Sequence, residues 1–471
     1  MVFADNLFLY LFLPLCLALY FICPKIQMKN NVLIIFSLLF YAWGEQLYVL
    51  LLLASSLINY AAGLALAKHR DTKTGKQYLA LSLVVNIGLL AAFKYSGFIA
   101  ENLNLIPFVN LPVPKMHMPI GISFFTFQNI SYTLDCWWDK TPAQRSFRKY
   151  LLYISMFPQL VAGPIVRYSV IAEEIDNRHA TTEDISAGFS RLILGIAKKV
   201  IIANNINSAV TACFGQASDG YKAADSLTLL GAWYGATLVA LWYYFDFSGY
   251  SDIAIGMGRI FGFHFDENFN YPFVCRTIGE FWQRWHISLG SFFRDYLLYV
   301  PIFGKRRKYG GLFLVWFCTG LWHGASWNFV LWGLYYGMFV FIETLIGKKK
   351  LKKMPKVAAH IYTKLVIVVG FGIFYFENMP AMGKFFKALV GIGGVSNSVT
   401  NRIFMQYIFL FAAAVLFTFP IRQIVQKQVE GNPSRETAVA AVGIVCNAAL
   451  LLLSTVLLLN TTNNPFLYFR F

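Results

Sequence analysis

Long apolar runs joined by short basic loops are the feature of this sequence that most restricts its fold. The clearest runs cover residues 7–22, 47–67, 79–92, 361–376, 403–419 and 438–459. About 20 apolar residues make a helix that crosses roughly 30 Å of hydrocarbon. Adding the more polar stretches between these runs, we expect about ten to thirteen membrane segments, some of them re-entrant.

The composition indicates a membrane protein and excludes a soluble one. Of the 471 residues, 57% are hydrophobic and 13% are charged, whereas about 25% are charged in a soluble domain. A chain of this composition has too little polar surface to cover itself in water. The apolar runs are also continuous, without the alternation that the lipid-facing strands of a barrel require. We therefore predict an all-α protein that crosses the lipid bilayer many times.

The positions of the charges predict a membrane topology. The net charge is +17, but the basic residues lie in short loops between apolar runs, which argues against a nucleic-acid partner. Lys25 and Lys29 follow the first run, and no Lys or Arg precedes it. Because basic loops stay in the cytoplasm, we expect an uncleaved first helix and an extracytoplasmic N-terminus. Residues 305–308 and 348–356 are expected to be cytoplasmic for the same reason.

The chain is expected to form one integral membrane domain, residues 1–471, with three parts. Residues 1–115 and 347–471 are plain apolar helices, whereas residues 116–346 mix Gly, Pro, Trp, His and carboxylates into the apolar sequence and form the predicted catalytic core. The cysteines show no CxxC spacing. There is no HxxxH pair either, and the one HxxE, His264 with Glu267, lies apart from the other histidine motifs. We therefore expect no metal site and no bound cofactor.

The core begins with the string PIGISFFTFQNISYTLDCWW, residues 119–138. Gln128, Tyr132 and Asp135 recur at spacings that place them on one face of a helix. Polar groups in lipid are costly unless they meet partners or water, so this face is expected to point into the helix bundle. Hydrogen bonding between helices and the lining of a cavity both fit the pattern.

Two further strings in the core bear on its architecture. FPQLVAGPIVRY, residues 157–168, is too short to span and is interrupted by Pro and Gly, which predicts a kinked or re-entrant element. In DFSGYSDIAIGMG, Asp246 and Asp252 are six residues apart. That spacing puts them on different helix faces, so we expect each to have a structural Arg or Tyr partner rather than to form a paired-carboxylate site.

Two histidine motifs carry the strongest chemical signal. EFWQRWHISLGSFFRDY contains His286, and GLWHGASWNF contains His323 about forty residues later. Ionisable groups at membrane depth are default candidates for function, and imidazole can accept a proton from an attacking hydroxyl. A buried histidine that serves packing alone is the alternative. The neighbouring candidates for the substrate site are Trp282, Arg284, Trp285, Arg294, Trp322, Trp327 and Asn328, together with Gln128 and Asp135.

The depth of His323 follows from the topology. The basic residues on both sides of its segment are expected in the cytoplasm, so the segment must enter the membrane and return. From Leu312 to His323 there are about twelve residues, or roughly 18 Å of helix, which is less than a full crossing. We therefore expect His323 near the middle of the membrane, at or beside a turn.

Taken together, these strings resemble the membrane-bound O-acyltransferases, most of all the bacterial branch that contains alginate O-acetyltransferase and the D-alanyl transfer protein of teichoic acids. The resemblance rests on PIGISFFTFQ, FPQLVAGPIVRY, DFSGYSDIAIGMG, FWQRWHISLGSFFRDY, GLWHGASWNF and the final NPFLYF. It runs in order along nearly the whole chain. It implies a ring or cup of helices around a tunnel, in a bacterial cell membrane, that joins a cytosolic donor to an extracytoplasmic acceptor.

The resemblance also implies roles for individual residues. His323 matches the histidine expected to act as general base, and His286 the second polar position, which would orient the substrate or stabilise an oxyanion. The implied donor is acetyl-CoA or another acyl thioester, and the implied acceptor is a polysaccharide reached with an extracytoplasmic acetyltransferase-like partner. Phosphate contacts by Lys305, Arg306, Arg307 and Lys308 are conceivable, although a role in topology explains these residues more simply.

Other functions remain open from sequence. Within the enzyme class, D-alanyl transfer from a carrier protein to teichoic acid competes with acetyl transfer. A polysaccharide-precursor transporter or an assembly subunit would also have many spans and buried charges, although the internal repeats typical of many transporters are missing.

Overall fold

The computed structural model describes residues 2–300, 307–459 and 466 of the chain, and their regular structure is helical. Among them there is no strand, only an isolated bridge between Phe269 and Trp285. The all-α class is therefore confirmed. Lys305, Arg306 and most of the final NPFLYF string lie outside the described residues.

Six described helices are long and apolar enough to cross a membrane. They are α3 (Tyr48–Lys68), the continuous helix Lys73–Leu103, α17 (Trp327–Ile346), α19 (Lys356–Tyr375), α21 (Ser398–Phe417) and α23 (Pro433–Leu459), and Phe8–Ile22 is a shorter apolar helix. Each apolar run found in the sequence falls within one of these helices or extends at most two residues beyond it. The protein is thus a multi-pass membrane protein. The expected total of about ten to thirteen segments stays a prediction.

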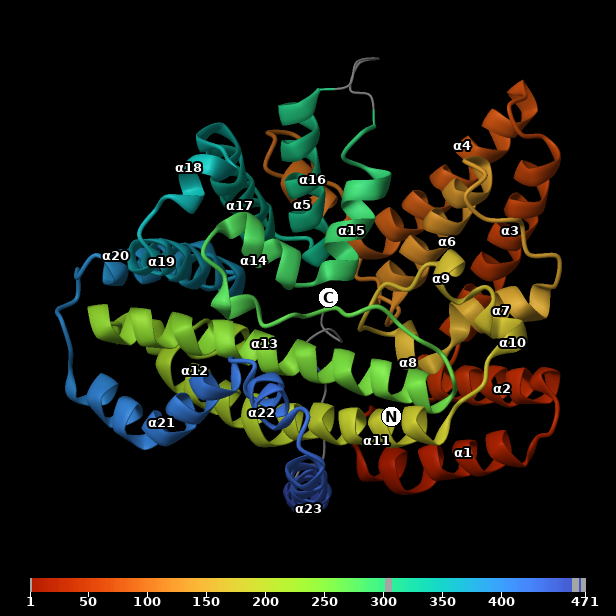
Figure 1. The fold of residues 1–471 in the computed structure, drawn as a ribbon. Helices are drawn as coiled ribbons and strands as arrows, with labels where there is room; N and C mark the ends of the chain where they lie inside the picture. The colour runs from red at the N-terminus through yellow and green to blue at the C-terminus, as the bar shows by residue number, and fades with distance from the viewer. Residues whose placement is uncertain (1, 301–306, 460–465, 467–471) are drawn as a thin grey trace. The chain divides into compact units, whose positions relative to one another are not determined.

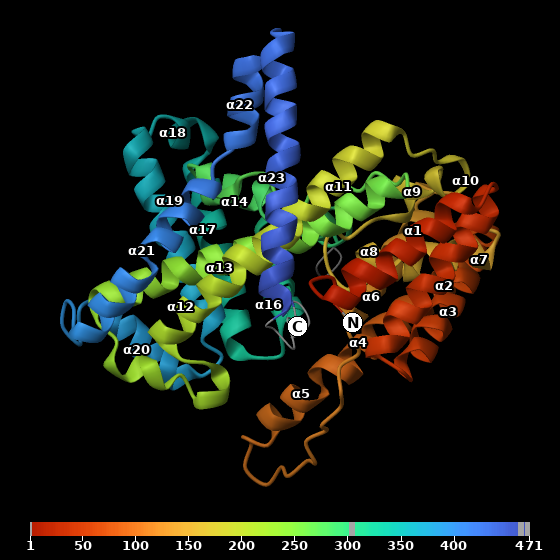
Figure 2. The same ribbon diagram turned by 90° about the horizontal axis from the view of Figure 1, so that it is seen from below.

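The described chain separates into two compact units, and the division falls within the long helices α11 (Thr182–Ala197) and α13 (Leu229–Ile260). The first unit contains residues up to Leu192, residues Tyr250–Glu267 and, at the C-terminus, Phe466. Here α1 (Leu13–Ile22), α2 (Ile26–Gly44), α3 and α4 (Lys73–Leu90) pack with α6 (Ile122–Trp137) and α7 (Phe147–Ser155), as Figure 2 shows.

Amide side chains join the helices of the first unit. Nδ2 of Asn86 on α4 donates to Oδ1 of Asn59 on α3 over 2.7 Å, and Nδ2 of Asn129 on α6 donates to the Ser55 hydroxyl over 2.9 Å. The Tyr150 hydroxyl on α7 donates to Oδ1 of Asn129 over 2.7 Å. Such contacts substitute for water, which is absent at membrane depth. They hold this unit together.

The string FPQLVAGPIVRY lies in the first unit and breaks the helical structure, as predicted. Helix α8 covers only Phe157–Leu160, and the next helix, α9 (Tyr168–Ile171), begins after an irregular segment. Gly163 in that segment has a φ of +96°, which a residue with a Cβ rarely adopts. The segment is buried in protein, which satisfies the condition for broken backbone in a membrane protein.

The second unit, Ile193–Gly249 and Asn268–Thr462, contains the two histidine motifs. Its helix α16 (Lys308–His323) turns back into α17, and Figure 1 shows the two lying beside each other. A Cβ on Gly320 would approach the Phe329 carbonyl oxygen to 2.3 Å, and one on Gly333 would approach the Trp316 carbonyl oxygen to 2.3 Å. Glycine at these positions lets the two backbones approach closely.

The two aspartates of α13 have separate partners on separate faces, as expected from their spacing. Asp252, in the first unit, pairs with Arg191 over 3.0 Å, which confirms an Arg partner. Asp246, in the second unit, pairs with Lys199, a partner that was not predicted from the sequence. The Asp246–Lys199 pair is buried next to a close helix contact, where a Cβ on Gly249 would meet the Gly195 carbonyl oxygen at 2.8 Å. A lysine on the facing helix therefore forms an ion pair with Asp246.

Candidate functional site

His286 occupies a strained turn between two short helices. It lies between α14 (Ile278–Arg284) and α15 (Ile287–Tyr296), with φ of 45° and ψ of 54°. This left-handed conformation costs roughly 1–3 kcal/mol in a residue with a Cβ, and it persists only where the surroundings enforce it. His286 is 2% exposed. The fold therefore places this imidazole at a defined position in the protein interior.

The side chain of Asn268 holds the His286 ring in place. Its Oδ1 lies 3.1 Å from Nδ1 of His286 and accepts hydrogen bonds from the backbone N–H of Ser288 over 3.3 Å and from its hydroxyl over 2.9 Å. A backbone N–H can only donate, so the amide oxygen, and not the amide nitrogen, must face the turn. The Asn268 carbonyl also accepts from the backbone N–H of Ile287 over 3.0 Å. One buried asparagine thus fixes both the backbone and the ring.

This contact determines the tautomer of His286. An amide oxygen has no proton to give, so Nδ1 carries the proton and Nε2 of the neutral ring has a lone pair. His286 lies outside the six apolar spans. Burial lowers the pKa of its imidazole to about 3, because the charged form loses its hydration. The ring is therefore neutral near pH 7 and presents an acceptor at Nε2.

His323 is the last residue of α16 and lies at the turn into α17. Its ring centroid is 4.9 Å from those of Trp322 and Trp332 and 5.0 Å from that of Phe374. The turn is tight, because a Cβ on Gly324 would meet the Phe329 ring at 2.2 Å. The expected position at a turn is confirmed, and its depth in the membrane stays a prediction. His323 is an ionisable group in an aromatic enclosure, only 6% exposed.

Trp322 brings the two histidine motifs together. Its ring centroid is 5.6 Å from that of His286 and 4.9 Å from that of His323. On another side, the His286 ring lies edge-on to Phe247 of α13, with 4.6 Å between centroids. Two imidazoles about forty residues apart in sequence therefore contact one indole and form one buried cluster with it.

Three more predicted residues pack around this cluster. The Trp282 ring lies 4.9 Å from Trp316 and 5.5 Å from Trp332, between α16 and α17. Trp285 lies 5.1 Å from Phe371 of α19. Nδ2 of Asn328 donates to the carbonyl oxygen of Phe374, whose ring contacts His323. Trp282 and Asn328 therefore contact residues that touch His323, and Trp285 packs against α19 directly before His286.

The remaining predicted residues of this unit are placed differently. Arg284 pairs with Glu280 over 3.0 Å, and Arg294 pairs with its neighbour Asp295 over 2.8 Å. Both guanidinium groups are thus engaged by carboxylates at partly exposed positions. Trp327 is 51% exposed. A role for these three residues in binding substrate stays a prediction.

Gln128 and Asp135 lie in the first unit, on α6. Both are buried, at 1% and 2% exposure, and so is Tyr132 between them. The predicted polar face of this helix therefore does point into the protein. The Tyr132 hydroxyl accepts a hydrogen bond from the backbone N–H of Gln144, a structural contact. A role for Gln128 and Asp135 in lining the substrate path stays a prediction.

Sequence reasoning missed four neighbours of the histidines. Asn268 lies 18 positions before His286, and Phe247, Trp332 and Phe374 come from three other helices. Phe and Trp are too common in this chain to stand out. The only local signal for Asn268 is an amide within the short connection after α13, which by itself does not distinguish a ring-holding residue from an ordinary turn residue.

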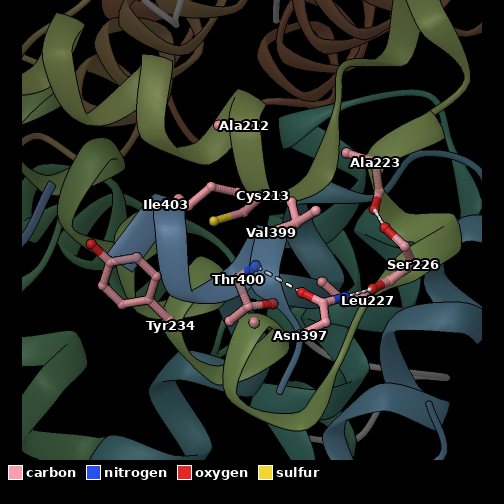
Figure 3. A pocket seen from close by; sticks show the side chains of 11 residues that line it. Ala212, Cys213, Ala223, Ser226, Leu227, Tyr234, Asn397, Val399, Thr400 and Ile403 are labelled. Atoms are coloured by element: carbon pink, nitrogen blue, oxygen red, sulfur yellow. Dashed lines mark hydrogen bonds between the residues drawn. The ribbon is translucent and has the colours of Figure 1, made fainter. Parts of the chain in front are cut away.

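One pocket of the described residues lies elsewhere in the second unit. It is a cavity of about 40 Å³, seen in Figure 3, with Cys213, Tyr234, Asn397 and Thr400 among its lining residues. It has no residue in common with the histidine cluster. The residues that the structure describes also contain no group of three or more His, Cys, Asp or Glu able to hold a metal ion.

Comparison with known proteins gives a consistent result. Residues 33–378 match the model of the membrane-bound O-acyltransferase family. The chain is 35% identical to the probable alginate O-acetylase of Azotobacter vinelandii over the full length of both proteins. It is 34% identical to the peptidoglycan O-acetyltransferase of Helicobacter pylori, over 84% of this chain and 81% of that one. It is 28% identical to the teichoic acid D-alanyltransferase of Bacillus subtilis, over 64% of this chain and 81% of that one.

Proposed function

This chain belongs to the membrane-bound O-acyltransferase family and is an O-acyltransferase, and from that premise we propose that it O-acetylates an extracytoplasmic polysaccharide with an acetyl group from a cytosolic thioester. The names of its relatives support this choice. Two of the three are O-acetylating enzymes by name. The sequence identity to these two is higher than to the D-alanyltransferase, and the alignments cover more of this chain. D-alanyl transfer is the alternative within the same chemistry.

The observation that carries the proposal is the pair of buried imidazoles around Trp322. In the proposed reaction the acceptor oxygen attacks the thioester carbonyl carbon while His323 takes the hydroxyl proton. The tetrahedral intermediate then collapses, the carbon–sulfur bond breaks, and the proton passes from His323 to the leaving thiolate. Proton transfer by a positioned base contributes about 10² to 10⁴ in rate.

His286 takes the second role in this proposal. Its neutral ring with a lone pair on Nε2 accepts a hydrogen bond and so suits the orientation of a substrate hydroxyl. It suits an oxyanion less well, because stabilising one requires a donor. Between the two roles implied by the family resemblance, the contact with Asn268 thus favours orientation.

The donor, partner and topology complete the proposal. Acetyl-CoA or another acyl thioester would supply the acetyl group from the cytoplasmic side. A separate acetyltransferase-like protein outside the membrane would complete transfer to the polymer, and the N-terminus would lie on that outer side. The single membrane domain with its core at residues 116–346 is part of the same proposal.

The test is the acetyl ester content of the cell-surface polysaccharide in strains that carry His323→Ala, the unaltered chain, or a deletion. We expect His323→Ala to match the deletion while its amount in the membrane stays normal. Acetylation at the unaltered level in His323→Ala, with a defective deletion strain, would refute the general base. A deletion strain that loses D-alanyl ester instead of acetyl ester would establish the alternative.

A further inference from the structure

Glu343 is a buried carboxylate that the proposed chemistry does not use. It lies in the apolar span α17, three residues before its end, and is 6% exposed. A carboxylate in such a position is costly unless it has partners, so its presence calls for a physical reason.

The partners of Glu343 come from the first residues of α14. Its Oε1 accepts a hydrogen bond from the backbone N–H of Ile278 over 2.6 Å, and its Oε2 accepts one from the backbone N–H of Gly279 over 2.8 Å. The Tyr362 hydroxyl on α19 donates to Oε1 over 3.3 Å. The first N–H groups of a helix have no partner within it, and a carboxylate satisfies them well. Here the carboxylate comes from a different helix.

Helix α14 is attached to α17 at a second point. Trp282, one turn after Gly279, lies 5.5 Å from Trp332 and 4.9 Å from Tyr336 between ring centroids. The distance along α17 from Glu343 to Tyr336 is about 10 Å, and the length of α14 is similar, at 1.5 Å per residue. The start of α14 is therefore held at Glu343 and its middle at the aromatic rings further back along α17.

This attachment links the two helical segments that carry the imidazoles. Helix α17 belongs to the hairpin that carries His323, and α14 leads through Trp285 into the strained turn at His286. A shift of α14 along α17 would move the His286 ring relative to His323. Displacements of about 1 Å between catalytic groups can reduce a rate by about 10².

We propose that Glu343 is a positioning residue that sets the distance of His286 from His323 by anchoring the start of α14 to α17. The inference rests on the proposed function, because it gives Glu343 a role only if the two imidazoles act together. Glutamine at this position keeps the volume but presents an NH₂ group, a donor, to one of the two backbone N–H groups. The anchor then loses one hydrogen bond and gains a donor–donor contact.

The experiment measures polysaccharide acetyl ester in cells that carry the full chain with Glu343→Gln at normal membrane levels. We expect at least a tenfold loss for Glu343→Gln and a smaller loss for Tyr362→Phe, which removes only the third donor. Thr344→Val is the matched control, because the Thr344 hydroxyl donates to the Val340 carbonyl within α17, away from α14. This control is expected to stay within twofold of the unaltered chain.

A double-mutant cycle separates positioning from general stability. We expect Glu343→Gln to have little further effect in a chain that already carries His286→Asn, because α14 then has no imidazole to place. An equal loss in both backgrounds would overturn the inference, as would full activity of Glu343→Gln. His323→Ala is measured in parallel. If that variant keeps full acetylation, the proposed function fails, whereas its inactivity beside an active Glu343→Gln rejects only the role of Glu343.

Discussion

Buried polar side chains occur in both units, but they are used differently. In the first unit, Asn59, Asn86 and Asn129 lie on regular helices and hydrogen-bond to one another or to hydroxyl groups. In the second unit, Asn268 instead holds an ionisable ring in a left-handed turn. Polarity inside the membrane protein is therefore not itself a sign of catalysis. Backbone strain combined with a fixed tautomer distinguishes His286 from the polar groups that only join helices.

The largest effect is expected in the second unit, where His323 is the proposed general base. Glutamine in place of His323 keeps a polar side chain of similar size but cannot accept and release a proton. We expect His323→Gln to lower the rate of acetylation by about 10² to 10⁴, measured as acetyl ester formed per amount of protein in isolated membranes. The matched His286→Gln variant should lose less. The reverse order would assign the base to His286.

The second prediction concerns pH and the residue that holds His286. Asn268→Asp keeps an acceptor for the three donors and adds a negative charge, which raises the pKa of His286 from about 3. A ring that becomes protonated loses its acceptor, so activity should fall as pH decreases through the new, higher pKa. We expect the acid limb of the pH–rate profile in membranes to move to higher pH. If neither the acid limb of the pH–rate profile nor the activity changes, the neutral His286 ring does not act as the required acceptor.

A third prediction probes the first unit. Asn59→Leu removes the hydrogen bonds to Asn86 and to the Ser55 carbonyl. We expect the free energy of unfolding in detergent to fall by about 1 kcal/mol, as for other hydrogen bonds between membrane helices. Acetylation per folded molecule should not change. A tenfold loss per folded molecule would mean that this network does more than join helices.

The smallest effect is expected at Arg284. Its partly exposed pair with Glu280 spans one helical turn, and pairs at that spacing contribute about 0.3–0.5 kcal/mol. We expect Arg284→Gln to leave acetylation within twofold, and thermal unfolding of the purified protein to be nearly unchanged. A larger loss of acetylation at normal protein level would restore Arg284 as a substrate contact.

Much of the architecture was predictable because hydropathy is a local property. Each apolar run, such as residues 438–459, coincides closely with an apolar helix of the structure. The break at Gly163 and the turn after His323 were also predicted, from glycine, proline and segment length. The Lys partner of Asp246 was not predicted. The spacing of two aspartates shows which helix faces they occupy, but it does not show which residue lies opposite each of them.

The candidate site was predictable only in its central residues. His286 and His323 stand out as ionisable groups in apolar sequence, and the tryptophans beside them followed from proximity. Arg284 and Arg294 were included for the same reason, yet their guanidinium groups pair with carboxylates at partly exposed positions. Neighbours in sequence point in different directions from a helix or turn, so proximity along the chain does not decide which side chains share a pocket.

The sequence by itself determined that this protein is a helical membrane protein with two histidine motifs, because the cost of exposing polar backbone to lipid leaves long apolar runs few other structures. Only the tertiary structure decided that Asn268 fixes the tautomer of His286, that Trp322 contacts both imidazoles, and that Glu343 anchors α14. Apart from the contact between the neighbours Trp322 and His323, these contacts join residues 18 to 65 positions apart. They arise from how helices pack, which depends on the shapes of many side chains at once.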